Sequence, residues 1–233
     1  MRQIVKAFLC VIVLFSLLQA CKKSGGGDST TGNNFSDSIR SIISQPIIDS
    51  LRKWGLNIND GNTPPSVTGI FLLHPDSCIF DNSGYNTAGE IYDDYKIRFS
   101  QQNNSKLTIR VDRKDVGSDA DNASDSIATF ISGNGNYFTI FAQEKGVESG
   151  IGYTSLDIYS GQITAAGIAG FQLAHYEKSK DPDPGNVLIS VGSSRIFMNS
   201  GGPAQSVSTF SVDPIMQQHV FGTHSMMSGV RRN

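Results

Sequence analysis

The sequence predicts a mainly β protein, and three observations carry the prediction. From about residue 67 onward, apolar and polar residues alternate with a period of two, as in the run 95–100. Such runs recur at short, regular spacing and are separated by clusters of Gly, Asn, Asp and Pro. Helical patterns do not alternate with these runs, as they would in a fold built from β-α-β units. Antiparallel sheets with one buried face have this signature, so we expect antiparallel pairing throughout.

Residues 1–20 predict a secretory signal peptide. Basic residues precede the apolar run 7–18, which is shorter than the ~20 residues that a membrane-spanning helix needs. The small residue Ala20 occupies the cleavage position, and Cys21 follows it directly. The segment resembles the bacterial lipoprotein signal, and this resemblance implies that Cys21 carries a lipid anchor.

Residues 21–35 predict a flexible tether, because they are rich in Gly, Ser, Thr and Asn and almost free of apolar side chains. Stable attachment to a membrane requires two or more lipid chains, and the resemblance to a processed bacterial lipoprotein implies this arrangement at Cys21. An Asp directly after the lipidated cysteine would resemble the signal that retains lipoproteins in the inner membrane. This chain has Lys22 at that position. We therefore expect a lipid-anchored protein of the cell envelope, at the outer membrane.

Composition limits the remaining classes of function. The formal net charge of −2 becomes −4 once the signal segment and its two basic residues are removed, and this mild acidity argues against a nucleic-acid partner. Cys10 leaves with the signal and Cys21 is acylated, so Cys78 has no partner for an internal disulfide. Because Cys78 precedes Ile79 and Phe80, we expect a buried, unreactive thiol.

Residues 36–62 predict a short N-terminal helical segment. Its apolar residues recur at spacings of three and four and define one helical face: Ile39, Ile42, Ile43, Ile47, Ile48 and Leu51. Pro46 is tolerated only in a first turn, so we expect a second helix with Ser44 as its N-cap and Gly55 as its stop. The apolar face is expected to pack on the β-domain.

The β-domain is predicted over residues 63–233. Its expected strands are 67–73, 95–100, 107–112, 126–132, 137–143, 152–159, 168–176 and 187–197. Alternation in the first hairpin places Ile97, Phe99, Leu107, Ile109 and Val111 on the buried face and Arg98 and Arg110 on the wet face. Lys145-Gly146 and Ser160-Gly161 are expected breaks between strands. Residues 206–233 show little periodicity and receive no element.

About eight short strands joined by tight turns predict an antiparallel up-and-down barrel. Glycines inside the expected strands, such as Gly152 and Gly170, fit the bends of a strongly curved sheet. The architecture is similar to that of lipocalins, although the Gly-x-Trp motif of that family is missing, since the only tryptophan is Trp54 in the helical segment. A β-sandwich is the alternative that the same pattern allows.

We expect neither a metal site nor a cofactor. The acidic loop 112–125 offers the hard oxygen ligands that calcium prefers, but its spacing departs from the EF-hand pattern. The acids of this loop are Asp115, Asp119, Asp121 and Asp125. His74 lies four residues before Cys78, and closeness in sequence does not make a catalytic pair without an orienting third group.

Four triplets resemble the Asp-(Ser/Thr)-apolar acceptor of O-glycosylation in exported proteins of Bacteroidota. They begin at Asp28, Asp37, Asp49 and Asp125. Together with the lipoprotein signal and the tether, they make the chain similar to uncharacterised surface lipoproteins of that group. This resemblance implies a location and a β-rich domain, and it implies no activity.

Two classes of function remain. The first, which we prefer, is a lipid-anchored binding module for a small apolar ligand, a glycan or a partner protein. The alternative is a hydrolase that acts on envelope or extracellular glycans or esters. A binding module needs only a β-surface with aromatic side chains, whereas an enzyme needs a catalytic set that the sequence does not display, so we expect no enzymatic activity.

The expected ligand-binding residues are aromatic side chains on the predicted strands. They are Tyr92, Tyr95, Tyr137, Tyr153, Tyr159 and Tyr176. A clustered, solvent-open patch of these tyrosines would favour the binding module. A cleft that holds His175 beside Glu177 or Asp157 would favour an enzyme.

Overall fold

The computed structural model describes residues 34–85, 88–92, 94–116 and 126–210. Over these residues the helices are α2 (Asp37–Ile42) and α3 (Gln45–Lys53). The strands are β1 (Gly69–Leu73), β2 (Asp76–Asp81), β3 (Ile91–Tyr92), β4 (Tyr95–Asn103), β5 (Thr108–Asp115), β6 (Ser126–Asn134), β7 (Tyr137–Glu148), β8 (Ile151–Thr164), β9 (Gly167–Lys180), β10 (Ser194–Asn199) and β11 (Gln205–Ser206).

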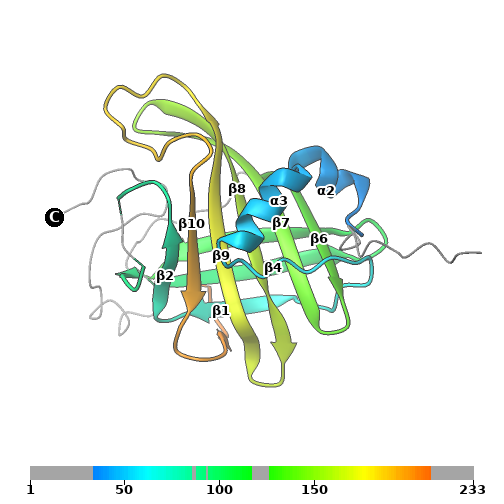
Figure 1. Ribbon diagram of the computed structural model, residues 1–233. Coiled ribbons are helices and arrows are strands. Elements are labelled where there is room, and N and C mark those ends of the chain that lie inside the picture. Colours follow the sequence, from blue (N-terminus) through cyan, green and yellow to red (C-terminus); the bar gives the residue numbers. More distant parts are fainter. Residues whose placement is uncertain (1–33, 86–87, 93, 117–125, 211–233) are drawn as a thin grey trace, which may run out of the picture. The chain divides into compact units, whose positions relative to one another are not determined.

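The strands form one strongly curled sheet (Figure 1), and the pairs of neighbouring strands are antiparallel. Their order is β11-β1-β4-β5-β6-β7-β8-β9-β10-β2-β3. From β4 to β10 each strand pairs with the next one in sequence, which is the arrangement of a meander. The prediction of a mainly β, antiparallel fold is confirmed.

The two helices form where the apolar periodicity predicts them. Ser36 caps α2 through its hydroxyl, which accepts a hydrogen bond from the Ile39 N–H at 3.3 Å. Ser44 is the N-cap residue of α3, and proline stands in its first turn as expected. Gly55 has a φ of +105°, the left-handed conformation that commonly ends a helix.

Two expected breaks are wrong, because Gly146 and Gly161 lie inside the long strands β7 and β8. These glycines make room for other side chains instead of turning the chain. A Cβ on Gly146 would stand 2.7 Å from the Tyr153 hydroxyl, and a Cβ on Gly161 would collide with Ile168. Close packing inside a curled sheet therefore explains glycines that resemble turn signals.

Strands β2, β3 and β11 were not predicted. β3 and β11 contain two residues each, too few to show alternation. The register between β2 and β10 shifts between Ile196 and Phe197, so the period of two is interrupted there. The expected strand 187–197 is correct only from Ser194 onward, because Asp183 holds residues 187 and 188 in a loop by accepting hydrogen bonds from both backbone N–H groups.

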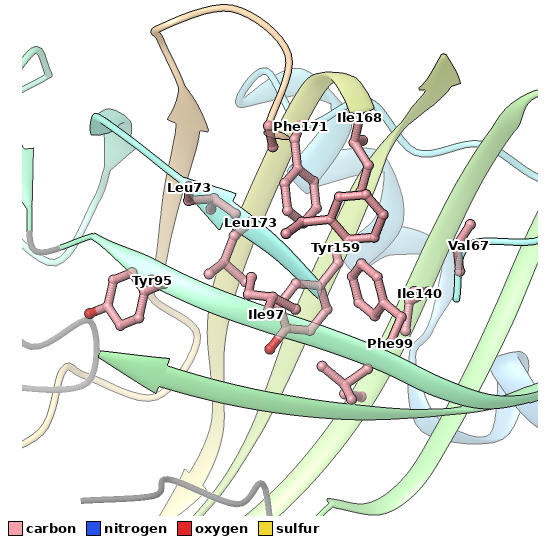
Figure 2. Packing of buried hydrophobic residues seen from close by; sticks show 14 of the residues in the cluster. Val67, Leu73, Tyr95, Ile97, Phe99, Ile140, Tyr159, Ile168, Phe171 and Leu173 are labelled. Atoms are coloured by element: carbon pink, nitrogen blue, oxygen red, sulfur yellow. The ribbon is translucent and has the colours of Figure 1, made fainter. Parts of the chain in front are cut away.

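Both faces of the sheet carry buried side chains. The inner face carries an apolar core in which the Phe99 ring contacts four other aromatic rings. These rings belong to Phe71, Phe138, Tyr159 and Phe171, at centroid distances of 5.8 to 6.1 Å. Figure 2 shows several members of this core, which come from opposite sides of the curl. Aromatic rings therefore fill this part of the interior.

The outer face is covered by α2 and α3 over β6 to β9 (Figure 1). Ile39, Ile48 and Leu51 of the helices are buried in one cluster with Phe141 of β7 and Ile158 of β8. Burying an aliphatic side chain of this size contributes roughly 1.5–3 kcal/mol. The expectation that the helical face packs on the sheet is confirmed.

A strap, residues 55–63, continues from α3 across the outer faces of β9, β8, β7 and β6 (Figure 1). Beneath it lies a row of buried polar side chains that oppose one another directly across these four strands. The row consists of Ser132, Thr139, Ser160 and Gln172. These residues satisfy strap backbone groups that the sheet ladder cannot reach.

Individual hydrogen bonds fix the strap at several points. Gln172 accepts a hydrogen bond from the Asn57 N–H at 2.8 Å and donates one to the Gly55 carbonyl at 2.9 Å. Thr139 accepts from the Asn59 N–H at 2.8 Å. Ser132 donates to the Asn59 carbonyl at 2.7 Å. The outer face is thus polar in this row and nevertheless buried, because a backbone segment covers it.

Burial in the first hairpin follows the expected alternation with one exception. Ile97, Phe99, Ile109 and Val111 are buried. Leu107 is only half-buried, because it lies in the turn before β5 with a φ of +53°. Arg98 and Arg110 lie on the other face and are 41 % and 51 % exposed, and both pair with the carboxylate of Asp112 at 2.9 Å.

Cys78 is fully buried in the inner core, as its apolar neighbours predict. Burial raises the pKa of its thiol to about 11, so the reactive thiolate form is disfavoured. Among the described residues, no helix is both long and apolar enough to cross a membrane.

Candidate functional site

One row of the outer face, next to the strap, is left uncovered. Two residues before Thr139, Tyr137 of β7 opposes Gln162 of β8, and Gln162 opposes Ala169 of β9. Residues two apart on a strand share a face, so this row continues the surface on which the strap lies. Tyr137 is 49 % exposed, which is unusual for a large aromatic side chain beside a core.

Two hollows adjoin Tyr137 and share Asn59 as a second lining residue. The first measures about 470 Å³ and is lined by Ile58, Asn59, Asp60, Asn134, Gly135 and Tyr137. The second measures about 320 Å³ and is lined by Asn57, Asn59, Tyr137, Gly161, Gln162, Ala169 and Gly170. Both volumes lie within the ~300–1,000 Å³ typical of ligand sites. We call the two hollows together the strap groove.

The polar walls of the strap groove are held in place by the fold. The Asn59 side-chain amide donates hydrogen bonds to the Phe138 carbonyl at 3.0 Å and to the Ser160 hydroxyl at 3.1 Å. Asn134 accepts a hydrogen bond from the Thr63 hydroxyl at 3.3 Å. Amide side chains offer both donors and acceptors, so the groove presents mixed hydrogen-bonding groups around an aromatic ring.

A second polar feature lies on the inner face, beside the aromatic core. We call it the interior charged cluster; it comprises Arg113 of β5, Ser155 and Asp157 of β8, and His175 and Glu177 of β9. Asp157 opposes His175 in the strand register, and Ser155 opposes Glu177. These positions continue the buried alternation of their strands, which brings charged side chains into the interior.

Asp157 is the centre of the interior charged cluster. It accepts a hydrogen bond from the Arg113 guanidinium at 2.7 Å and lies 2.7 Å from His175 Nδ1. His175 Nε2 lies 3.7 Å from a carboxylate oxygen of Glu177, too far for a hydrogen bond. The side chains of Asp157, His175 and Glu177 are fully buried, whereas that of Arg113 is 13 % exposed.

The protonation states follow from these contacts. Burial alone would lower the pKa of His175, but the two neighbouring carboxylates raise it to about 9, so the imidazole is charged at neutral pH. Burial alone would raise the pKa of Asp157, but Arg113 and His175 bring it below its ordinary value. A chain of alternating charges, Arg113–Asp157–His175–Glu177, is the result.

Within the part of the chain that the structure describes, several buried polar atoms of the interior charged cluster have no hydrogen-bond partner. They are Arg113 Nε, Ser155 Oγ, His175 Nε2 and both carboxylate oxygens of Glu177. The Tyr159 hydroxyl beside them is also without a partner. Buried polar groups are nearly always hydrogen-bonded, so a group of such atoms in one place requires an explanation.

The six predicted tyrosines do not form one patch. Tyr95, Tyr153 and Tyr159 lie around the interior charged cluster, with the Arg113 guanidinium 5.7 Å from the Tyr95 ring centre. Figure 2 shows Tyr95 and Tyr159 among the apolar side chains of the inner core. Tyr137 alone lines the strap groove.

The remaining two tyrosines lie elsewhere. Tyr92 is buried edge-on against Phe197, with ring centres 4.9 Å apart, and Tyr176 is half-buried against the outer core beneath the helices. The groove residues Asn57, Asn59 and Gln162 were missed by sequence reasoning. A signal for the first two exists in retrospect, because four of the six residues 57–62 are asparagine or aspartate, which is typical of an irregular segment and not of a strand.

The pairing of His175 with Asp157 or Glu177, which would favour an enzyme if it lay in a cleft, is present in part. His175 lies beside both Asp157 and Glu177, but all three side chains are fully buried, and the imidazole is held protonated. A protonated histidine does not serve as a general base. Over the described residues, no three or more His, Cys, Asp and Glu side chains are grouped to hold a metal ion. The predicted acidic loop lies mostly outside the described residues.

Comparison of the chain with protein-family models, with curated proteins and with solved structures finds no match.

Proposed function

We propose that the protein is a lipid-anchored carbohydrate-binding module of the cell envelope and that the strap groove holds the glycan. The observation that carries the proposal is the half-exposed ring of Tyr137 between two preformed hollows with amide walls. Sugars present C–H groups on one face and hydroxyl groups at their edges. An aromatic ring suits the first, and side chains that both donate and accept hydrogen bonds suit the second.

The groove favours binding over hydrolysis. Glycosidases generally use two carboxyl groups about 5–10 Å apart. Asp60 is the one acid among the residues that line the two hollows, and it already accepts a hydrogen bond from the Asn34 N–H at 3.2 Å. The arrangement therefore supports capture of a glycan without cleavage.

An apolar ligand inside the curl is less well supported. Four aromatic rings contact the Phe99 ring at centroid distances of 5.8 to 6.1 Å, which is the packing of a filled core. The strap groove, in contrast, lies open on the outer face and needs no rearrangement to admit a ligand.

We also propose that the sheet closes into an eight-stranded up-and-down barrel. β1 and β2 are consecutive, and β1 pairs with β4 whereas β2 pairs with β10. Treated as two halves of one bent strand, they join the first and last strands of the meander. The bridge between Ile168 and Ala204 supports closure on the same side, because β11 follows Ala204 directly and pairs with β1.

The lipid on Cys21 and the tether 21–35 complete the proposal. A binding domain on a flexible linker can sample ligands near the membrane surface without a fixed orientation. This arrangement suits a protein that captures envelope or extracellular glycans.

The proposal is tested by titration calorimetry of the full-length protein with oligosaccharides of glucose, mannose, galactose and N-acetylglucosamine. We expect one of these series to bind, and Tyr137→Ala to weaken binding at least tenfold, equivalent to about 1.4 kcal/mol. Tyr137→Phe keeps the ring and should retain most of the affinity.

The matched control is Val191→Ala, which shortens an exposed apolar side chain outside the groove. It should bind like the unmodified protein. Failure of every series to bind, or equal weakening by Val191→Ala, would contradict the proposal. Release of reducing sugar during the titration would instead support the hydrolase.

A further inference from the structure

The strap groove extends across several strands. Four outward residues of neighbouring strands oppose one another in the register and form a row beside the strap; they are Asn134 of β6, Tyr137 of β7, Gln162 of β8 and Ala169 of β9. Neighbouring strands lie ~4.8 Å apart, so a row across four strands is roughly 14 Å long. Both hollows lie along this row and share Asn59 and Tyr137. A linked chain of sugars that lies along the strap can therefore occupy both hollows and cover the ring between them.

Several polar side chains of the groove have hydrogen-bonding groups left for a ligand. In the part of the chain that the structure describes, the side-chain amides of Asn57 and Gln162 make no hydrogen bond. Asn134 uses its carbonyl oxygen as an acceptor, and its amide N–H groups stay available. One carboxylate oxygen of Asp60 accepts a backbone N–H, and the other stays available. These groups can bind sugar hydroxyls, which both donate and accept hydrogen bonds.

The charge of the groove is negative. Asp60 is the one charged side chain among the described residues that line the two hollows. Arg52 contacts the strap at the Ile58 carbonyl, at 3.0 Å, but it lines neither hollow, and its guanidinium lies 5.9 Å from the Phe35 ring. A carboxylate or sulfate group on a sugar is usually bound by arginine or lysine. In this groove it would instead meet the carboxylate of Asp60, and juxtaposed like charges disfavour binding.

We propose that the strap groove binds linked, uncharged sugar units and rejects acidic glycans, with Asp60 as the residue that sets this specificity. The inference rests on the proposed function, because it names the class of glycan that the same site takes. The available oxygen of Asp60 accepts hydrogen bonds from sugar hydroxyls, and its charge repels carboxylate and sulfate groups. The net negative charge of the chain acts in the same direction.

The test uses tetrasaccharides of glucose, mannose, galactose and N-acetylglucosamine in three forms. The first form is unmodified, and in the other two the C6 hydroxymethyl groups are converted to carboxylates or to carboxamides. The last two forms have nearly the same shape, and only the carboxylate form is charged. By titration calorimetry at low salt, we expect the full-length protein to bind the carboxamide form of the series that it recognises at least tenfold more tightly than the carboxylate form. Added sodium chloride should reduce this preference by screening the charges.

Two variants show whether Asp60 is the cause. Asp60→Asn keeps the shape of the side chain and an oxygen that can accept the Asn34 N–H, and it removes the charge. The preference for the carboxamide form should then fall from at least tenfold to less than threefold. The control Asp49→Asn removes a negative charge from the exposed surface of α3 and should keep the full preference. The same preference in Asp60→Asn as in the unmodified protein would overturn the assignment.

The length of the ligand gives a second readout. A monosaccharide reaches only one of the two hollows, so the unmodified tetrasaccharide should bind at least tenfold more tightly than the monosaccharide of its series. Equal affinities would contradict a ligand that spans both hollows.

The outcomes separate this inference from the proposed function. If no unmodified tetrasaccharide binds, the proposed function itself fails, and the inference fails with it. If an unmodified tetrasaccharide binds and its carboxylate form binds as tightly as its carboxamide form, only the inference fails. Rejection of both modified forms would also overturn it, because shape and not charge would then set the specificity.

Discussion

Individual side chains divide the inner face of the sheet into an apolar part and a charged part. Along β8 the inward positions change from Tyr159 to Asp157, and along β9 they change from Leu173 to His175. The charged side chains are tolerated because each finds an opposite charge nearby. The interior thus combines a filled core with a polar site.

The buried imidazole makes folding stability depend on pH. His175 has an ordinary pKa of 6.5 and a folded pKa of about 9, so the folded state binds its proton more tightly than the unfolded state does. A group with a raised folded pKa stabilises the fold fully below 6.5, and this contribution is lost as pH rises through 9. The shift corresponds to a contribution of about 3 kcal/mol.

We therefore expect the free energy of unfolding to fall by about 3 kcal/mol from this group between pH 6 and pH 10. Urea unfolding at pH 6, 8 and 10 measures it. His175→Gln removes the titrating group and should show a flatter profile over the same window. The same slope in both proteins would show that His175 is not the cause, and an NMR titration of its ring gives the folded pKa directly.

The alternation of inward and outward positions along the strands predicts part of the candidate sites. Since Asp157 and His175 fall on the inward positions of their strands, their burial follows from alternation once the strands are located. Their mutual pairing depends on the register between β8 and β9, which contains two shifts, and one sequence does not reveal a bulge. Tyr137 was among the predicted ligand residues, but its outward position beside the strap depends on tertiary structure.

Among the elements, the strap gives the molecule a feature that local patterning does not predict. Ser132 and Thr139 appear in the sequence as the wet side of two strands and Ser160 as part of a break, whereas the structure buries all three beneath the strap. The helices were predictable because their period and caps are local signals. The strap depends on contacts about 70 to 120 residues apart in sequence, for which no local signal exists.

Two glycines in the strap provide a matched test of its attachment to β6. Both Gly55 and Gly61 have positive φ, at +105° and +120°. A Cβ on Gly55 meets nothing within 4 Å, whereas a Cβ on Gly61 would stand 2.5 Å from the Gly133 carbonyl oxygen. Replacement by alanine therefore adds backbone strain at both positions and a clash at only one.

We expect Gly55→Ala to destabilise the protein by about 1–2 kcal/mol and Gly61→Ala by about 1–3 kcal/mol more. Urea unfolding measures both, and hydrogen exchange of the Thr63 and Gly133 amides reports release of the strap. Equal stability of the two variants, with hydrogen exchange of the Thr63 and Gly133 amides unchanged from that of the unmodified protein, would show that the strap is detached in solution.

For the whole molecule, attachment to the membrane is predicted to depend on a single residue. Cys21→Ser removes the lipid acceptor and should release the protein from the membrane fraction into the soluble fraction. Cell fractionation with immunoblotting measures this, with Cys78→Ser as the control that removes a buried thiol elsewhere in the chain. A Cys21→Ser protein that remains with membranes would contradict lipid anchoring.

The central claim is that the strap groove is the glycan site, and NMR mapping tests it most directly. Isotope-labelled protein is titrated with the oligosaccharide that binds most tightly. The account predicts that the amide signals of Asn59, Tyr137 and Gln162 shift together and saturate at one affinity, while the signal of Val147, on the hairpin at the other end of β7, stays in place. Shifts centred on that hairpin, with Tyr137 and its neighbours unchanged, would contradict the claim.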